Sequence, residues 1–313
     1  MSLDTGIEWT DVTWNPIRGC SRVSEGCRNC YAELQAARFS GPGLPFEGLA
    51  RRVNGRAAWT GKVRFVPKKL AEPLHWKKPR NVFVNSMSDL FHEKLSDEQI
   101  AAVFGVMAQC PQHTWQVLTK RPERAERWFL WVARRGQPDV ECFAAAGSLL
   151  PGGDGLRLPY RRAPWPLGNV HLGVSVEDPP TAEERLSVLL RCPAAVRWAS
   201  YEPALAGVDF EPWLVPGGLD WVVVGGESGP YARPFDLDWA RQVVAQCRAA
   251  SIPCFVKQLG SLPVETYLYQ APGEPLPTLH MARYMFRHSH GGDPAEWPEG
   301  LRVRQFPAKE IGP

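Results

Sequence analysis

The sequence lacks the features of a membrane or secreted protein. Its 313 residues contain no apolar run of about 18 residues, so no membrane-spanning helix is predicted. Residues 1–6 lack the basic and apolar regions of a signal peptide, and we therefore expect a cytoplasmic protein. An excess of one charge is also missing, because 36 Lys and Arg stand against 33 Asp and Glu, a net charge of +3. The overall charge therefore gives no argument for a nucleic-acid or membrane partner, and no membrane partner is expected.

Internal repeats and low-complexity tracts are absent as well. The 30 Pro residues separate short apolar runs and do not gather in one tract. Hydrophobic residues make up 44% of the chain and charged residues 22%, which is typical of an ordinary globular protein. A chain of this length can bury its core as one large domain or as two smaller ones.

Six short apolar runs are predicted to be buried strands. They are residues 81–84, 115–118, 170–176, 196–199, 221–224 and 253–256. Amphipathic segments at 96–109, 181–190 and 237–249 are predicted helices, the first of them opened by a capping-box pattern. Alternation of strand and helix indicates a parallel sheet with helical crossovers. We expect an α/β fold with a partial or full (β/α) barrel of about six parallel strands, the alternative being an open doubly wound sheet.

Two segments do not follow this alternation. Residues 136–168 are rich in Gly and Pro and are predicted to form a loop inserted into the barrel. From residue 261 onward the pattern is mostly irregular. The predicted organisation is therefore a barrel-like domain at 1–260 that carries an N-terminal cysteine loop, followed by a C-terminal extension at 261–313 packed on the barrel.

Polar residues directly follow each predicted strand. In a parallel βα architecture these carboxyl-terminal ends meet at one face, where such folds place their chemistry. The charged residues at these ends are Asp89, Lys120, Arg121, Glu177, Glu202, Glu227 and Lys257. Any one of them taken alone is equally consistent with a solvated strand end or a salt-bridged rim, but together they favour a site.

Three of the eight cysteines are clustered, in the pattern Cys20-x6-Cys27-x2-Cys30. In a reducing compartment such clustering indicates a metal centre and not a set of disulfides. Three thiolates leave one iron of a [4Fe-4S] cluster open for a ligand, whereas structural zinc needs a fourth protein ligand. The alternative is that these thiols are small buried hydrophobic groups. The other five cysteines are scattered, and Cys192, Cys247 and Cys254 are predicted to lie in the core.

Residues throughout the chain resemble an uncharacterised family of bacterial and phage proteins that is regarded as radical S-adenosylmethionine-like. The resemblance begins at Ile7-Glu8-Trp9-Thr10-Asp11-Val12-Thr13-Trp14-Asn15-Pro16 and continues through the three cysteines. Later matching segments are 84–92, 118–122, 173–177, 200–203, 225–229, 257–260 and 293–298. The resemblance thus covers most of the chain.

The resemblance implies a partial (β/α) barrel with Cys20, Cys27 and Cys30 as ligands of a [4Fe-4S] cluster. It further implies that S-adenosylmethionine binds the open iron and is cleaved to a 5′-deoxyadenosyl radical, with a flavodoxin- or ferredoxin-like reductant as partner. The implied cofactor-binding residues are Ser86, Ser88, Asp89, Ser175, Gly225, Gly226 and Glu227. The implied catalytic residues on the substrate side are Lys120, Arg121, Glu177, Glu202 and Lys257.

The chain departs from the commonest pattern of the radical superfamily in two ways. The first cysteine interval is six residues, whereas the usual interval is three. The motif Gly225-Gly226-Glu227 follows a late strand, whereas typical members carry Gly-Gly-Glu after the second strand. For this reason Ser86, Ser88 and Asp89 are the preferred candidates for the amino group of the cofactor.

An aromatic and basic stretch early in the chain suggests a nucleic-acid partner, because aromatics stack on bases and cations contact phosphates. Its members are Trp9, Trp14, Trp59, Trp76, Arg51, Arg52, Arg56, Lys62, Arg64, Lys68, Lys69, Lys77, Lys78 and Arg80. The alternative is an ordinary solvated charged surface. If nucleic acid binds, a base or nucleotide is the expected substrate, and its modification or repair the expected reaction.

Three interpretations of the cysteine motif therefore remain open. The first is a radical S-adenosylmethionine enzyme. The second is a non-catalytic binding module in which zinc is held by the three cysteines and by His92, His288 or His290. The third is a cluster that serves only electron transfer or stability.

Overall fold

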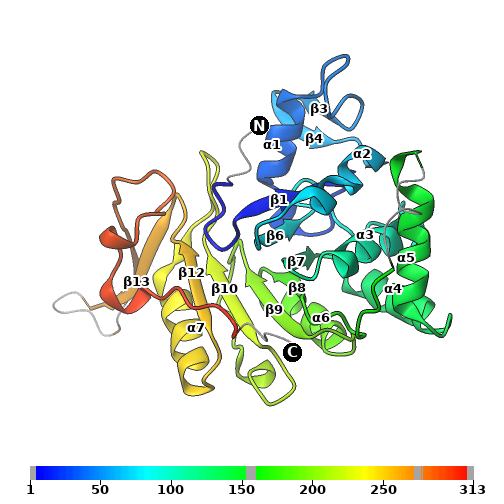
Figure 1. Cartoon of the computed structure of the whole chain (residues 1–313). Coiled ribbons are helices and arrows are strands. Elements are labelled where there is room, and N and C mark those ends of the chain that lie inside the picture. Colours follow the sequence, from blue (N-terminus) through cyan, green and yellow to red (C-terminus); the bar gives the residue numbers. More distant parts are fainter. Residues whose placement is uncertain (1–4, 153–159, 271–275, 277, 309–313) are drawn as a thin grey trace. The chain divides into compact units, whose positions relative to one another are not determined.

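The computed structural model describes residues 5–152, 160–270, 276 and 278–308 (Figure 1). The chain forms two compact units. The first holds the residues up to Ser175 together with Arg185–Trp198, and the second holds Val176–Glu184 and Ala199–Pro307. Each unit is described by itself below. No helix in the described ranges is both long enough and apolar enough to cross a membrane.

A seven-stranded sheet forms the centre of the α/β fold. Its order is β1 (Val12–Trp14), β6 (Asn81–Val84), β7 (Thr114–Thr119), β8 (Val170–Val176), β9 (Val196–Tyr201), β10 (Trp221–Gly225) and β12 (Cys254–Gln258). The registers from β1 to β8 and between β10 and β12 are parallel. Because the order follows the chain and never reverses, the doubly wound alternative is wrong.

All six predicted strands are confirmed, and a seventh, β1, precedes them. β1 has only three residues, too few to show a periodic pattern of apolar positions, although Val12 and Trp14 are buried. The indole nitrogen of Trp14 donates a hydrogen bond to the carbonyl of Lys69 at 2.6 Å. β1 therefore ties the start of the chain into the core of the first unit.

The three predicted helices are also confirmed. They are α3 (Asp97–Gln109), α6 (Pro179–Leu189) and α7 (Leu237–Ala249). Ser96 and Gln99 form the expected capping box of α3, and Asp236 caps α7 by accepting from the N–H of Asp238. Local side-chain chemistry thus sets where these helices begin.

The predicted loop at 136–168 is partly wrong, because α5 (Pro138–Leu149) lies within it. Pro138 suits the first turn of a helix, and α5 packs closely on α3, so that a Cβ at Gly105 would clash with the carbonyl of Cys142. In Figure 1 α3 and α5 lie together with α4 (Pro122–Ala133). Residues 153–159 of the predicted loop lie outside the described ranges.

The remaining elements of the first unit are short and surround the N-terminal loop. They are β2 (Ile17–Arg18), η1 (Glu25–Cys27), α1 (Tyr31–Arg38), β3 (Ala50–Val53), β4 (Arg56–Trp59), β5 (Arg64–Phe65), α2 (Pro67–Leu70) and η2 (Glu72–His75). β2 pairs with β5 and β3 pairs with β4, both antiparallel. By pairing with β5, β2 is held at the point where the cysteine loop begins.

The second unit corrects the prediction of an irregular segment after residue 261. There β13 (Pro263–Tyr269) and β14 (Thr278–Arg283) form an antiparallel pair beside β11 (Phe235–Asp236). Every residue of β14 is exposed, so this strand has no buried face, and its sequence shows no alternating pattern that would predict a strand. The short helices of this unit are η4 (Glu211–Trp213), η5 (Pro294–Glu296) and η6 (Glu299–Leu301). The predicted domain boundary near residue 260 stays a prediction.

Candidate functional site

The three clustered cysteines lie in the first unit on one loop between β2 and α1. Cys20 follows β2, Cys27 ends η1, and Cys30 is the residue before the first turn of α1. All three side chains are of intermediate exposure. The loop begins tightly, since Gly19 has a positive φ of 90° and any Cβ there would clash with the carbonyl of Lys62. The chain therefore delivers three reachable thiols from one short segment.

Charge and burial act against each other at these thiols. Burial and, to a smaller extent, the Asp89 carboxylate raise the pKa of Cys20 to about 12, although Arg121 acts in the opposite direction. Burial also raises the pKa of Cys30, against the backbone N–H groups of Glu33 and Ala32 in the first turn of α1. Cys30 is coupled electrostatically to both Cys20 and Cys27. Binding of a metal centre would have to release the protons of Cys20 and Cys30.

The structure does not bring the three thiols together around a single ion. Within the described ranges, no three His, Cys, Asp or Glu side chains converge closely enough to hold one ion. In a [4Fe-4S] cluster each thiolate binds a different iron, so its ligands need not converge on one point. Ligation of a cluster by Cys20, Cys27 and Cys30 stays a prediction.

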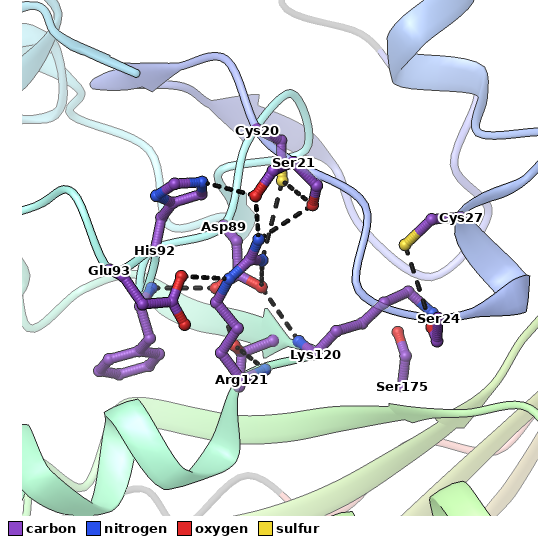
Figure 2. Close-up of polar contacts among 12 residues, drawn as sticks. Cys20, Ser21, Ser24, Cys27, Asp89, His92, Glu93, Lys120, Arg121 and Ser175 are labelled. Atoms are coloured by element: carbon purple, nitrogen blue, oxygen red, sulfur yellow. Dashed lines mark hydrogen bonds and ion pairs between the residues drawn. The ribbon is translucent and has the colours of Figure 1, made fainter. Parts of the chain in front are cut away.

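Arg121 links the cysteine loop to the carboxyl ends of β6 and β7 (Figure 2). Its guanidinium donates to Asp89 at 3.0 Å, to Glu93 at 3.0 Å, and to both the carbonyl and the hydroxyl of Ser21 at 2.9 Å. It also points an N–H at the Cys20 sulfur, 3.8 Å away. The side chain is only 4% exposed. Burial lowers the pKa of Arg121, but Asp89, Cys20 and Glu93 outweigh that effect and raise it, so the charge stays.

Asp89 is the centre of this group. It accepts hydrogen bonds from the Thr119 hydroxyl at 2.7 Å, from the backbone N–H groups of Phe91 at 2.9 Å and Lys120 at 3.0 Å, and from Arg121. Its carboxylate is therefore engaged by donors of its own chain. A role in binding the amino group of a cofactor stays a prediction, and it would require Asp89 to share these contacts.

Ser86 and Ser88 contact the segment that precedes the cysteines. The Ser86 hydroxyl lies 3.1 Å from the amide nitrogen of Asn15, and the Ser88 hydroxyl donates to the carbonyl of Ile17 at 3.0 Å. Ser175, near the end of β8, is buried, and its carbonyl accepts from Arg185 at 2.8 Å. In Figure 2 Ser175 lies on the same side of the group as Lys120. The structure thus gathers five of the predicted cofactor-side and substrate-side residues around the cysteine loop: Ser86, Ser88, Asp89, Lys120 and Arg121.

The second unit brings together a separate group of predicted residues. The Glu202 carboxylate accepts from Lys257 at 2.6 Å and from the amide of Gln258 at 3.1 Å. Glu227 forms a two-pronged ion pair with Arg233, at 3.0 Å from Nε and 2.7 Å from a terminal nitrogen. These pairings satisfy the charges within the unit, and the predicted catalytic role of Glu202 and Lys257 stays a prediction.

The Gly225-Gly226 turn approaches its own chain closely. A Cβ at Gly226 would come within 2.9 Å of both the Leu259 carbonyl and the Phe235 ring, which explains the glycine without a ligand. At Gly225 the nearest contacts of a Cβ would be ordinary, at 3.4 Å or more. Glu177 is fully buried, and its carbonyl accepts from the N–H of Leu205. Binding of an adenine or ribose at this turn stays a prediction.

Several residues of these groups were not predicted. Ser21, Glu93 and Thr119 hold Arg121 and Asp89, while Gln258 and Arg233 hold Glu202 and Glu227. Each lies within a few residues of a predicted member, so proximity to a strand end was the available signal. Which carboxylate pairs with which cation depends on rotamers and register that the sequence does not reveal.

Comparison with known proteins identifies a family but no activity. A search of curated proteins and a search of solved structures each give no match. The model of one family, described as a protein of unknown function (DUF5131), matches residues 4–290. Because this match spans most of the chain, the protein belongs to the DUF5131 family.

Proposed function

We propose that this protein is an iron–sulfur enzyme that uses S-adenosylmethionine for radical chemistry. The observation that carries the proposal is the loop of three partly exposed cysteines with a buried guanidinium directed at Cys20. The chain-ordered parallel sheet supports a partial (β/α) barrel, whose carboxyl-terminal face is the usual place for chemistry. Asp89 and Arg121 follow two neighbouring strands, β6 and β7, and meet this loop.

Cys20, Cys27 and Cys30 would hold a [4Fe-4S] cluster. When bound and reduced by a flavodoxin- or ferredoxin-like partner, such a cluster would supply one electron for breaking the C5′–S bond of S-adenosylmethionine, with methionine and a 5′-deoxyadenosyl radical as products.

The residues of this chain orient and balance charge around that chemistry. Arg121 fixes the backbone of Ser21 and places positive charge beside Cys20, which favours the thiolate needed for ligation. Asp89 and Glu93 hold the guanidinium in place, so that its position is set before any ligand binds. Lys120, whose backbone N–H donates to Asp89, is the cation that we propose binds a carboxylate of the substrate.

The zinc-stabilised module is less well supported. His92 is the histidine of the first unit proposed for it, and both of its ring nitrogens are within hydrogen-bond distance of other groups. Nε2 lies 3.0 Å from the Ser21 hydroxyl, and Nδ1 accepts from the N–H of Lys94 at 3.2 Å. Zinc ligation by His92 would therefore break contacts that the structure makes.

The test is cleavage of S-adenosylmethionine. The full chain is reconstituted with iron and sulfide without oxygen, reduced with dithionite in the presence of S-adenosylmethionine, and assayed for 5′-deoxyadenosine by mass spectrometry. We expect 5′-deoxyadenosine from the wild type and from Cys247→Ala, which changes a core thiol, but none from Cys27→Ala. An intact cluster in the wild type without 5′-deoxyadenosine would overturn the radical assignment and leave a cluster for electron transfer or stability.

A further inference from the structure

The positive charge of this protein is concentrated in one short stretch. Residues 46–80 carry ten Lys and Arg but only two Glu, a net charge of +8, whereas the whole chain carries only +3. The remainder of the chain is therefore net negative. A local excess of this size attracts polyanions even when the overall charge is small.

The structure separates this stretch into two parts. Lys77, Lys78 and Arg80 precede β6 and so lie at its amino end, whereas the cysteine loop meets the residues after its carboxyl end. The cations of residues 51–68 lie on the elements that pack around the cysteine loop. We call this set the basic surface, and its members are Arg51, Arg52, Arg56, Lys62, Arg64 and Lys68, all exposed.

Two of the three arginines of the β3–β4 hairpin lie on the face opposite the core. Ala50 and Ala57 are buried on the face that packs near α1, so Arg51 and Arg56 share the opposite face. Arg51 lies opposite Ala58 and Arg56 opposite Val53, which makes the two arginines diagonal neighbours across the hairpin. The hairpin therefore presents a pair of adjacent cations to the solvent, next to α1 (Figure 1).

The basic surface is continuous with the cysteine loop. The backbone of Lys62 packs against Gly19, the residue before Cys20. Arg64 on β5 lies directly opposite Arg18 on β2, and Arg18 is the residue before Gly19. Two like charges therefore lie side by side next to that glycine. An anion bound along β5 would thus lie within a few residues of Cys20.

An exposed aromatic ring lies at the end of the cysteine loop. Tyr31 directly follows Cys30, is 50% exposed, and is oriented by a hydrogen bond from its hydroxyl to the carbonyl of Ser86 at 2.9 Å. Of the four predicted stacking residues, Trp9 and Trp14 are buried and offer no stacking surface, while Trp59 and Trp76 are half-buried. Trp59 packs against the cluster around Ala36, and Trp76 precedes the amino end of β6, away from the loop. The exposed ring of Tyr31 therefore offers the stacking surface nearest in the chain to the cysteines.

We propose that the basic surface binds the phosphate backbone of a single-stranded nucleic acid and brings a base over Tyr31, beside the cysteine loop. The inference rests on the proposed function for its chemical purpose, but the binding itself requires neither cluster nor cofactor. Single strands are favoured because a base inside a duplex would first have to be unstacked to reach the loop.

The first experiment measures binding of a fluorescein-labelled single-stranded DNA of about 20 nucleotides by anisotropy at increasing KCl, with the full chain and no S-adenosylmethionine. The variant Arg51→Gln/Lys62→Gln/Lys68→Gln removes three cations from the basic surface. The control Arg127→Gln/Arg134→Gln/Arg248→Gln removes the same charge from exposed positions on α4, its C-terminal cap and α7. We expect the surface variant to lower the slope of log K against log salt by about 2, since each phosphate contact contributes about 0.7, and the control to bind like the wild type.

Equal losses in both triple variants, or no salt-dependent binding by the wild type, would overturn the proposal. Vesicles of phosphatidylcholine and phosphatidylserine are the second probe, and binding to them but not to the oligonucleotide would overturn it in favour of a membrane surface. An RNA of the same sequence distinguishes the two kinds of strand, and a duplex is expected to bind more weakly than the single strand.

The second experiment tests the placement over Tyr31. Tyr31→Ala should weaken binding of the single strand at least about fivefold, and Tyr31→Phe, which keeps the ring, should restore it. An unchanged affinity in Tyr31→Ala would overturn this placement. Cys27→Ala should bind the oligonucleotide like the wild type while failing to cleave S-adenosylmethionine, so a failure of binding and a failure of radical chemistry are read separately.

Discussion

The loop cysteines differ from the core cysteines in exposure, whereas the pKa of Cys20 is no different from that of two core thiols. Burial raises the pKa of Cys110 and Cys192 to about 12, the same value that Cys20 reaches. For Cys110 burial is the whole cause, whereas Cys20 also interacts with Asp89, Arg121 and Cys30. A raised thiol pKa therefore does not distinguish a ligand from a core residue.

What distinguishes the loop thiols is access. Cys20, Cys27 and Cys30 keep intermediate exposure, while Cys110, Cys142, Cys192, Cys247 and Cys254 are all buried. A ligand must be able to reach a metal centre, and this requirement favours the loop. The predictions below compare the contacts of the loop with those of the core.

The largest effect is expected from the buried ion pair beside Cys20. Asp89→Asn should lower the free energy of unfolding by about 3–5 kcal/mol, because it leaves the buried Arg121 without its main counter-charge. Urea denaturation of the metal-free protein measures it. The matched control is Glu93→Gln, which removes a 58% exposed partner of the same arginine and should cost less than about 1 kcal/mol. Similar losses in the two variants would show that burial of the pair is not what matters.

A smaller effect should separate the two classes of cysteine. In the metal-free protein Cys247→Ala should cost about 1 kcal/mol, because it removes packing from a fully buried site. Cys27→Ala, at a partly exposed site, should change stability by less than about 0.5 kcal/mol. Denaturation curves of both variants provide the comparison, and a larger loss for Cys27→Ala would give the loop thiol a structural role of its own.

The smallest effect concerns His92, which contacts Ser21 in the cysteine loop. Burial, with the charge of Arg121, lowers its pKa in the folded protein below the usual 6.5. As the pH falls below about 6.5 the unfolded chain takes up a proton that the folded chain does not, so stability is lost on the acid side. His92→Gln should therefore show a shallower decline of stability between neutral and acid pH. An unchanged decline would mean that other groups control the acid limit.

The sheet was predictable because its strands are continuous apolar runs. β6 and β8 match the predicted bounds without change, since a strand buried on both faces needs no alternation to be recognised. β1 was not predicted because it has only three residues. β13 and β14 were not predicted because their many exposed residues show no alternation of apolar and polar positions. Helix α5 was not predicted because it lies in a stretch rich in Gly and Pro, a composition that indicates a loop.

The sequence predicted that residues at strand ends lie together, but not which of them pair. Asp89 and Arg121 were expected at one face because they follow predicted neighbouring strands, and the structure joins them at 3.0 Å. The sequence offered Arg121 as a substrate-binding cation, yet its contacts are with Asp89, Glu93, Ser21 and Cys20. Which charged residues pair across long distances in the chain depends on side-chain geometry, and the spacing of residues in the sequence does not reveal that geometry.

The most direct test of the account is the metal content of the loop. The wild type, Cys27→Ala and Cys247→Ala are reconstituted without oxygen, and iron, sulfide and zinc are measured per chain. The account predicts about four irons with matching sulfide in the wild type and in Cys247→Ala, and loss of both in Cys27→Ala. Stoichiometric zinc without iron, or iron that Cys27→Ala leaves in place, would contradict it.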